Sequence, residues 1–335
     1  MAEPTPEELF NLGMLSYDKQ DFSKARKYFE KACNLNYGGG CGALGDLYDD
    51  GKGVEKNLIK AAQYFSKACD LKYGGGCSNL GVLYQNGQVV EKDLTKAAYL
   101  YSKACDLEYG RGCNDLGELY YYGEDVEKNL IKAAQYFSKA CDLKYGGGCS
   151  NLGVLYQNGQ VVEKDLTKAA YLYSKACDLE YGRGCNDLGE LYYYGEDVEK
   201  NLIKAAQYFS KACDLKYGGG CSNLGVLYQN GQVVEKDLTK AAYLYSKACD
   251  LEYGRGCNDL GELYYYGEDV EKNLIKAAYF YSKACDLKEG MGCGNLGVLY
   301  YNGDGVKRDS KKADQYFSKA CKLGNQEACE VLKEK

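Results

Sequence analysis

Eighteen cysteines are the residues of this 335-residue chain with the clearest capacity for chemistry. From Cys33 to Cys329 their separations alternate between eight and 28 residues. Such cysteines could form a redox centre, bind zinc, stay free in a core or form disulfides. A thioredoxin-like centre needs C-x-x-C, and structural zinc needs cysteine or histidine pairs with two to four residues between them. Seven residues separate the close pairs and histidine is absent, so the spacing favours disulfides.

Two disulfide patterns are compatible with the spacing. Joining cysteines 28 apart, such as Cys41 with Cys69, is sterically possible but leaves Cys33 and Cys329 unpaired. Joining cysteines eight apart uses all eighteen, and a tight turn between two helices brings such positions into disulfide range. Each bridge would clamp one repeat to the next and would require an oxidising environment. The predicted pairs are Cys33–Cys41, Cys69–Cys77, Cys105–Cys113, Cys141–Cys149, Cys177–Cys185, Cys213–Cys221, Cys249–Cys257, Cys285–Cys293 and Cys321–Cys329.

The cysteine spacing defines a repeat of 36 residues, a period typical of helical solenoids. Apolar residues recur at helical spacing over about 75–86 and again over about 93–107. Gly87 suits the end of the first helix and Asp93 suits the N-cap of the second. Each repeat is therefore predicted to be an antiparallel pair, helix A followed by helix B. The glycines at 74–76 are expected to make room for a tight turn and a close first helical turn.

The predicted fold is an all-α solenoid of about nine helix pairs plus a C-terminal capping helix. Residues 1–36 are assigned to an N-terminal capping repeat, 37–288 to seven further repeats, and 289–335 to the last repeat and the capping helix. The first repeat opens with Thr5 and Glu8, the residues of a helix capping box.

A longer period of 72 residues is superimposed on the first. Residues 73–144 and 145–216 are identical, and 217–288 departs from them only at 279–281. Most surface substitutions change stability by no more than about 0.5 kcal/mol, so folding alone does not hold such positions fixed. Perfect identity indicates either a very recent duplication or deliberate engineering, and we favour engineering.

The charge pattern and the lengths of the apolar runs argue against some classes of binding partner. The net charge is -6 and the charges are well mixed, so no basic stripe favours nucleic acid. No apolar run approaches the length of about 18 residues that suggests a membrane span. The first residues, MAEPTPEELF, are not basic and apolar, so we expect no signal peptide.

Two catalytic or cofactor patterns occur in a context that argues against them. Residues 40–45 and 292–297 match G-x-G-x-x-G, but a dinucleotide site needs a preceding strand, and here a helix is predicted. Ser16 and Lys19 form a lone S-x-x-K, without the K-T-G and S-D-N motifs of penicillin-recognising enzymes. We therefore predict no catalytic, cofactor-binding or metal-binding residue.

The pattern Leu80-Gly81-x-x-Tyr84, followed by Ala97 and Ala104, resembles the Sel1-like repeat, a relative of the tetratricopeptide repeat. With cysteines eight apart, it is similar to the Helicobacter cysteine-rich proteins. The resemblance implies a right-handed superhelix with helix A on the concave face, a secreted or periplasmic parent with disulfides, and roles in protein interaction. Some members of that family have been described as penicillin-binding or weakly β-lactamase-like.

The resemblance also implies a groove lined by the helix A residues outside the Leu80 and Tyr84 face. Tyrosine offers a large amphipathic contact at low entropic cost, although Tyr121 and Tyr122 could equally pack on a neighbouring repeat. The predicted partner is an extended peptide or protein. The predicted groove residues are Ser78, Val82, Gln85, Asn86, Asn114, Glu118, Tyr121, Tyr122, Asn186, Glu190, Tyr193, Tyr194, Asn258, Glu262, Tyr265 and Tyr266.

These features favour a non-enzymatic, engineered repeat scaffold, produced as a recombinant protein and possessing a protein-binding type of surface. One alternative is a natural secreted or periplasmic interaction protein. The other is a penicillin-binding or β-lactamase-like enzyme.

Overall fold

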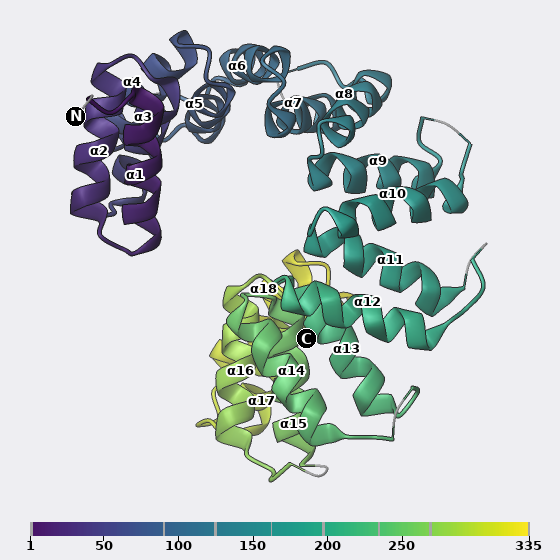
Figure 1. The fold of residues 1–335 in the computed structure, drawn as a ribbon. Helices are drawn as coiled ribbons and strands as arrows, with labels where there is room; N and C mark the ends of the chain where they lie inside the picture. Colours follow the sequence, from purple (N-terminus) through teal and green to yellow (C-terminus); the bar gives the residue numbers. More distant parts are fainter. Residues whose placement is uncertain are drawn as a thin grey trace. The chain divides into compact units, whose positions relative to one another are not determined.

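The computed structural model describes residues 3–89, 91–123, 126–161, 163–195, 198–233, 235–267 and 270–333. Within these ranges the chain forms 19 α-helices and no strand (Figure 1). The first 18 helices alternate as A and B, and the fold is an all-α repeat solenoid, as the sequence predicts. The prediction of no signal peptide rests on the segment MAEPTPEELF. Its first two residues, Met1 and Ala2, lie outside the described residues. The assignment of the terminal repeats as caps stays a prediction.

The helices have regular bounds. The A helices are α1 (Pro6–Asp18), α3 (Gly38–Asp50), α5 (Gly74–Asn86), α7 (Gly110–Tyr122), α9 (Gly146–Asn158), α11 (Gly182–Tyr194), α13 (Gly218–Asn230), α15 (Gly254–Tyr266) and α17 (Gly290–Asn302). The B helices are α2 (Phe22–Asn34), α4 (Leu58–Asp70), α6 (Leu94–Asp106), α8 (Leu130–Asp142), α10 (Leu166–Asp178), α12 (Leu202–Asp214), α14 (Leu238–Asp250), α16 (Leu274–Asp286) and α18 (Ser310–Lys322). A final helix, α19 (Gln326–Lys333), follows α18.

The helices pack into two compact units, Met1–Ala169 and Ala170–Lys335. Within each unit an A helix packs against the B helix that follows it, and that B helix packs against the next A helix. Successive A helices also contact each other, as α5 and α7 do in the first unit and α13 and α15 do in the second. The A helices of each unit therefore form a continuous layer.

Local capping signals explain where the helices begin and end. Asp93 caps α6, because its carboxylate accepts a hydrogen bond from the backbone N–H of Lys96 at 2.8 Å. Gly87 ends α5 in the left-handed conformation, with φ of 62°. Thr5 and Glu8 form a complete capping box at the start of α1. All three signals predicted from the sequence are confirmed.

The joint between one repeat and the next differs in part from the expectation. The residue in the left-handed conformation is Lys72, with φ of 62°, and Tyr73 is the N-cap of α5. The glycines at 74–76 lie inside the first turn of α5 and not in the turn before it. A Cβ at Gly76 would lie 2.5 Å from the Cβ of Ala68, so this glycine permits helices α4 and α5 to approach closely.

The core of each repeat is built from alanine, leucine, cysteine and one large aromatic ring. Tyr101 is fully buried, and a Cβ at Gly81 would lie 2.6 Å from its ring, so the glycine makes room for the tyrosine. The Tyr101 hydroxyl donates a hydrogen bond to Gln85 Oε1, which satisfies the buried polar group. In the described part of the chain, no helix is both long and apolar enough to cross a membrane.

Candidate functional site

The cysteines lie at the joints between helices and are joined in nine disulfides. Each joins cysteines eight residues apart, with Cα atoms 4.5 to 4.7 Å from each other, the pairing predicted above over the 28-residue alternative. Sixteen of the eighteen cysteines are buried, the exceptions being Cys321 and Cys329. Eight of the nine disulfides therefore hold neighbouring repeats together from within the core, and the ninth joins α18 to α19 at a partly exposed site.

A first set of polar contacts joins the A helices α5 and α7. The Ser78 hydroxyl donates to Asp115 Oδ2 at 3.2 Å, and Arg111 Nε lies 3.5 Å from the same oxygen. Ser78 has no exposed surface. The prediction that Ser78 contacts a ligand is therefore wrong, because its hydroxyl is committed to the neighbouring repeat.

Asp115 has an unusual environment for a carboxylate. Its pKa is raised to about 6, chiefly by burial and also by the nearby Glu118, whereas Arg111, Asn114 and Ser78 oppose the shift. The pKa of Asp259, at the corresponding place in α15, is also raised to about 6, again chiefly by burial. These carboxylates accept hydrogen bonds from serines of the preceding A helix, Asp115 from Ser78 and Asp259 from Ser222.

A second set of contacts orients a glutamate on alternate A helices. Asn186 Nδ2 donates to Glu190 Oε1 at 3.0 Å, and Asn223 Nδ2, from the next A helix, donates to the same oxygen at 3.1 Å. Asn223 Nδ2 also lies 2.9 Å from Asn186 Oδ1. The same arrangement recurs at Asn114, Glu118 and Asn151, and at Asn258, Glu262 and Asn295.

The three helix A asparagines at 114, 186 and 258 are no more than 4% exposed. The prediction that Asn114, Asn186 and Asn258 contact a ligand is therefore wrong, because each is buried under the glutamate that it orients. Asn114, Asn186 and Asn258 act on the surface only through Glu118, Glu190 and Glu262.

The predicted tyrosine pairs divide into two roles. Tyr122, Tyr194 and Tyr266 are each 67% exposed, which is a large fraction for an aromatic ring. Tyr121 instead contacts residues further along the chain. Its hydroxyl donates to Gln160 Oε1 at 3.3 Å, and Lys128 Nζ lies 5.7 Å from its ring centroid. The two rings of a pair meet edge to face, with centroids 5.0 to 5.1 Å apart and planes at 88°.

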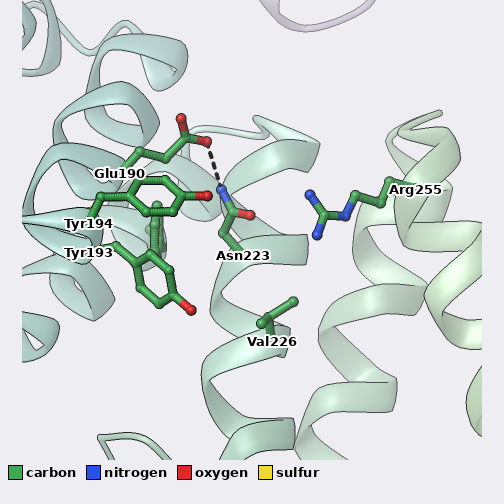
Figure 2. A pocket seen from close by; sticks show the side chains of 7 residues that line it. Glu190, Tyr193, Tyr194, Asn223, Val226 and Arg255 are labelled. Carbon is green, nitrogen blue, oxygen red and sulfur yellow. Dashed lines mark hydrogen bonds between the residues drawn. The ribbon is translucent and has the colours of Figure 1, made fainter.

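An open pocket of about 440 Å³ lies beside the second pair, with helices α11, α12, α13 and α15 supplying its walls. Figure 2 shows the rings of Tyr193 and Tyr194 on one side, Arg255 on the other, and Asn223 and Val226 between them. The residues that line it are Glu190, Tyr193, Tyr194, Phe209, Asn223, Val226 and Arg255.

A related pocket of about 420 Å³ lies 72 residues further along the chain. It is lined by Glu262, Tyr265, Tyr266, Tyr281, Asn295, Val298 and Leu299. The glutamate and tyrosine pair are repeated, whereas no arginine is among its lining residues.

Four pocket residues are absent from the predicted groove set: Phe209, Asn223, Val226 and Arg255. Val226 occupies in α13 the position that Val82, a predicted residue, occupies in α5, whereas the position of Asn223 was not chosen. A signal for Arg255 was available, since the arginine in YGRG recurs every 72 residues at Arg111, Arg183 and Arg255 near the start of an A helix.

The remaining predicted groove residues lie on α5. Val82 is half-buried and packs against the core cluster around Tyr101. Gln85 accepts the Tyr101 hydrogen bond, and Asn86 is exposed at the end of the helix. Only Asn86 of this group is free of a packing role in the described part of the chain.

The residues that match the catalytic and cofactor-binding motifs have structural roles. The Ser16 hydroxyl donates to the Leu12 carbonyl oxygen at 2.9 Å, and the residue is 7% exposed. The two G-x-G-x-x-G segments lie within helices α3 and α17. Among the described residues, no cluster of three or more histidine, cysteine or acidic residues could hold a metal ion.

Comparison with known proteins identifies the repeat. The sequence profile of the family described as Sel1 repeat matches nine segments of the chain. They are residues 9–37, 40–73, 75–109, 110–145, 147–181, 182–217, 219–253, 254–289 and 291–325.

Two curated Helicobacter pylori strain J99 proteins match over a short region. HcpC is 60% identical over 58 residues, and the protein named Beta-lactamase HcpA is 55% identical over 58 residues. Each match covers 17% of this chain, and it covers 20% of HcpC and 23% of HcpA. The match therefore spans about a fifth of the length of these relatives.

Two solved structures share the fold. One is c5321, a protective antigen present in uropathogenic Escherichia coli strains, with a TM-score of 0.59, 24% identity, and coverage of 94% of this chain and 76% of that chain. The other is a repeat protein from Oxalobacter formigenes, with a TM-score of 0.65, 25% identity, and coverage of 71% and 98%.

Proposed function

Because the chain belongs to the Sel1 repeat family, whose members are protein-interaction scaffolds, we propose that it is a non-enzymatic scaffold. Its ligand is an extended protein or peptide segment that lies along the layer of A helices. The family and fold support the interaction role, and the pockets on the A helices support the choice of face.

The combination of exposed tyrosines with pockets carries this choice of face, because Tyr194 and Tyr266 each line one of the two pockets described above. Tyr122, Tyr194 and Tyr266 are exposed to the same extent, at the same helix position, every 72 residues. An exposed tyrosine provides contact area with only two side-chain torsions to fix, which is why binding surfaces favour it. A ligand that spans several repeats of the second unit would meet this ring at Tyr194 and again at Tyr266, so an extended and repetitive ligand fits best.

The near-identity of the 72-residue blocks supports an engineered origin. We propose that the repeats come from a parent in an oxidising, extracytoplasmic environment, in keeping with the disulfides and the Helicobacter relatives. A genomic coding sequence in which the three blocks use different codons would contradict engineering and favour a natural interaction protein.

The binding face can be tested with a matched pair of variants. Peptides are selected from a displayed library of unstructured 15-residue sequences, and their affinities are measured by fluorescence polarisation. The test variant changes Tyr122, Tyr194 and Tyr266 to serine. The control variant changes Tyr99, Tyr171 and Tyr243, which are 66% exposed on B helices with the same 72-residue period.

We expect the A-helix variant to bind the selected peptides at least tenfold more weakly, because exposed tyrosines at the centre of an interface are frequent hot spots. The B-helix variant should bind within about twofold of the parent. Equal losses in both variants, or a loss only in the B-helix variant, would rule out the proposed face.

A further inference from the structure

We propose that the pocket lined by α11, α13 and α15 selects a pair of opposite charges on its ligand. A cationic side chain of an extended peptide binds Glu190, and an acidic side chain of the same peptide binds Arg255. This inference rests on the proposed function and adds to it the chemistry of the peptide.

Glu190 is prepared for a cation. The hydrogen bonds from Asn186 and Asn223 both reach Oε1, at 3.0 and 3.1 Å. The carboxylate is thereby fixed in one orientation through a single oxygen, and Oε2 is the oxygen that we assign to the cation. The exposed ring of Tyr194 lies beside it (Figure 2) and adds an aromatic surface that attracts a cation.

Arg255 lies on the opposite wall of the pocket and is positioned to bind an anion. Its Nε lies 3.8 Å from Asp259 Oδ2, and its side chain is 54% exposed. A guanidinium carries five N–H donors in a planar fork that matches a carboxylate. Figure 2 shows the terminal amino groups on the side that faces Asn223, which is the side of the pocket.

Asn223 and Val226 lie between Glu190 and Arg255, whereas the edge-to-face rings of Tyr193 and Tyr194, with centroids 5.1 Å apart, lie on the same side as Glu190 (Figure 2). In an extended peptide, residues two apart point to the same side. A ligand with a lysine and a glutamate two residues apart therefore presents both charges to the two walls, and the residue between them points away from the pocket.

The second pocket provides a comparison within the same molecule. Its glutamate, Glu262, is oriented in the same way by Asn258 and Asn295, but no arginine lines it. This second pocket can bind the cationic side chain of the ligand through Glu262, but it offers no arginine to the acidic side chain. The paired-charge preference should therefore depend on the arginine, and the cation preference on the glutamate.

The test uses the full-length oxidised protein and fluorescein-labelled peptides in a constant glycine–serine background. The central residues are lysine-tyrosine-glutamate, the reversed order, glutamine-tyrosine-glutamine, or two like charges around tyrosine. One variant changes Glu118, Glu190 and Glu262 to glutamine, which retains an oxygen for the asparagine donors. The other changes Arg111, Arg183 and Arg255 to glutamine.

We expect one of the two opposite-charge orders to bind at least tenfold more tightly than the neutral peptide. The arginine variant should lose the preference for the acid and keep that for lysine, and the glutamate variant should show the reverse. The preference should shrink at 1 M salt, where the Debye length is about 3 Å. Circular dichroism of both variants checks that the fold is retained.

Two outcomes would overturn the inference, and they can be told apart. If peptides bind the tyrosine face with no difference between charged and neutral sequences, the charge selection is wrong and the proposed function stands. If no peptide, whether selected or designed, depends on Tyr122, Tyr194 and Tyr266, both the proposed face and the charge selection are wrong.

Discussion

Asp115 and Asp259 are carboxylates that folding places in an unfavourable position. Each is buried between A helices, and each has its pKa raised from 3.8 to about 6, chiefly by burial. The folded state therefore favours their neutral form. Their contribution to stability is fully present below about pH 4 and is lost as the pH rises through 6.

Replacement of both residues by asparagine should reveal this contribution. The parent should lose stability relative to the Asp115→Asn, Asp259→Asn variant as the pH rises from 4 to 7. Since the two pKa values differ by about 2 units, the loss is at most about 3 kcal/mol for each carboxylate. Guanidinium midpoints measured at pH 4, 5, 6 and 7 give the comparison.

The control variant for this experiment also introduces asparagine, at Asp106 and Asp250. Their side chains are 76% and 74% exposed on B helices. Relative to that variant the parent should show little change with pH. A parent that gains stability over the Asp115→Asn, Asp259→Asn variant as the pH rises would contradict the assigned direction of the pKa shift.

Local signals at single residues could be read from the sequence, whereas burial between repeats could not. Asp93 and Gly87 act on backbone groups within a few residues, so their types suffice to predict a cap and a helix end. Ser78 and Asn114 are buried because side chains some 37 residues away cover them. Their place on helix A, outside the Leu80 and Tyr84 face, suggested exposure, and only the packing of successive A helices decides otherwise.

At the scale of elements, the joint between helices B and A combines a disulfide with a strained turn. A left-handed conformation costs roughly 1–2 kcal/mol for a residue other than glycine. Asn36 and Gly324 occupy this position at the first and last joints and are suited to it, whereas Lys72 and Glu108 are not. The residue type is therefore typical of a left-handed turn at the ends of the array but not at the interior joints.

The bridge at each joint offsets that cost. Closing a loop of eight residues stabilises the folded state by about 2.5 kcal/mol in the chain-entropy treatment. A disulfide joining positions 28 apart, such as Cys77 and Cys105, would instead close one helix pair on itself. The two patterns therefore differ in whether they hold neighbouring repeats together.

Tryptic mapping without reduction distinguishes these patterns, because Lys72 lies between Cys69 and Cys77. We expect the peptide that ends at Lys72 to be linked to the peptide that begins at Tyr73, and to separate from it on reduction. A link between the peptides that contain Cys77 and Cys105 would contradict the pairing in the structure.

At the scale of the whole molecule, the repeats should behave as interchangeable modules. Each contacts mainly its neighbours, so stability is close to a sum of repeat and interface terms. The period and the helix pairs could be predicted from the sequence, because every repeat restates the same local pattern. The pocket walls could not, because they are assembled from three repeats and no single repeat contains them.

Deletion of residues 145–216 tests this modularity. It joins Lys144 to Tyr217, which recreates the same junction as Lys144 with Tyr145. We expect a folded, fully oxidised protein with unchanged helicity per residue and a smaller denaturant dependence, because less surface is exposed on unfolding. A marked drop in helicity per residue would show that the blocks depend on distant parts of the chain.

The disulfides at the joints have a mechanical consequence. When the chain is pulled from its two ends, the seven residues between Cys69 and Cys77 cannot extend, because the covalent bond carries the load across 4.6 Å between Cα atoms. In that repeat only the segment from Cys41 to Cys69, 28 positions apart, can extend, to a length of about 100 Å at roughly 3.5 Å per residue. Under force each repeat would open as a separate loop between locked joints, and each step would lengthen when the bridges are reduced.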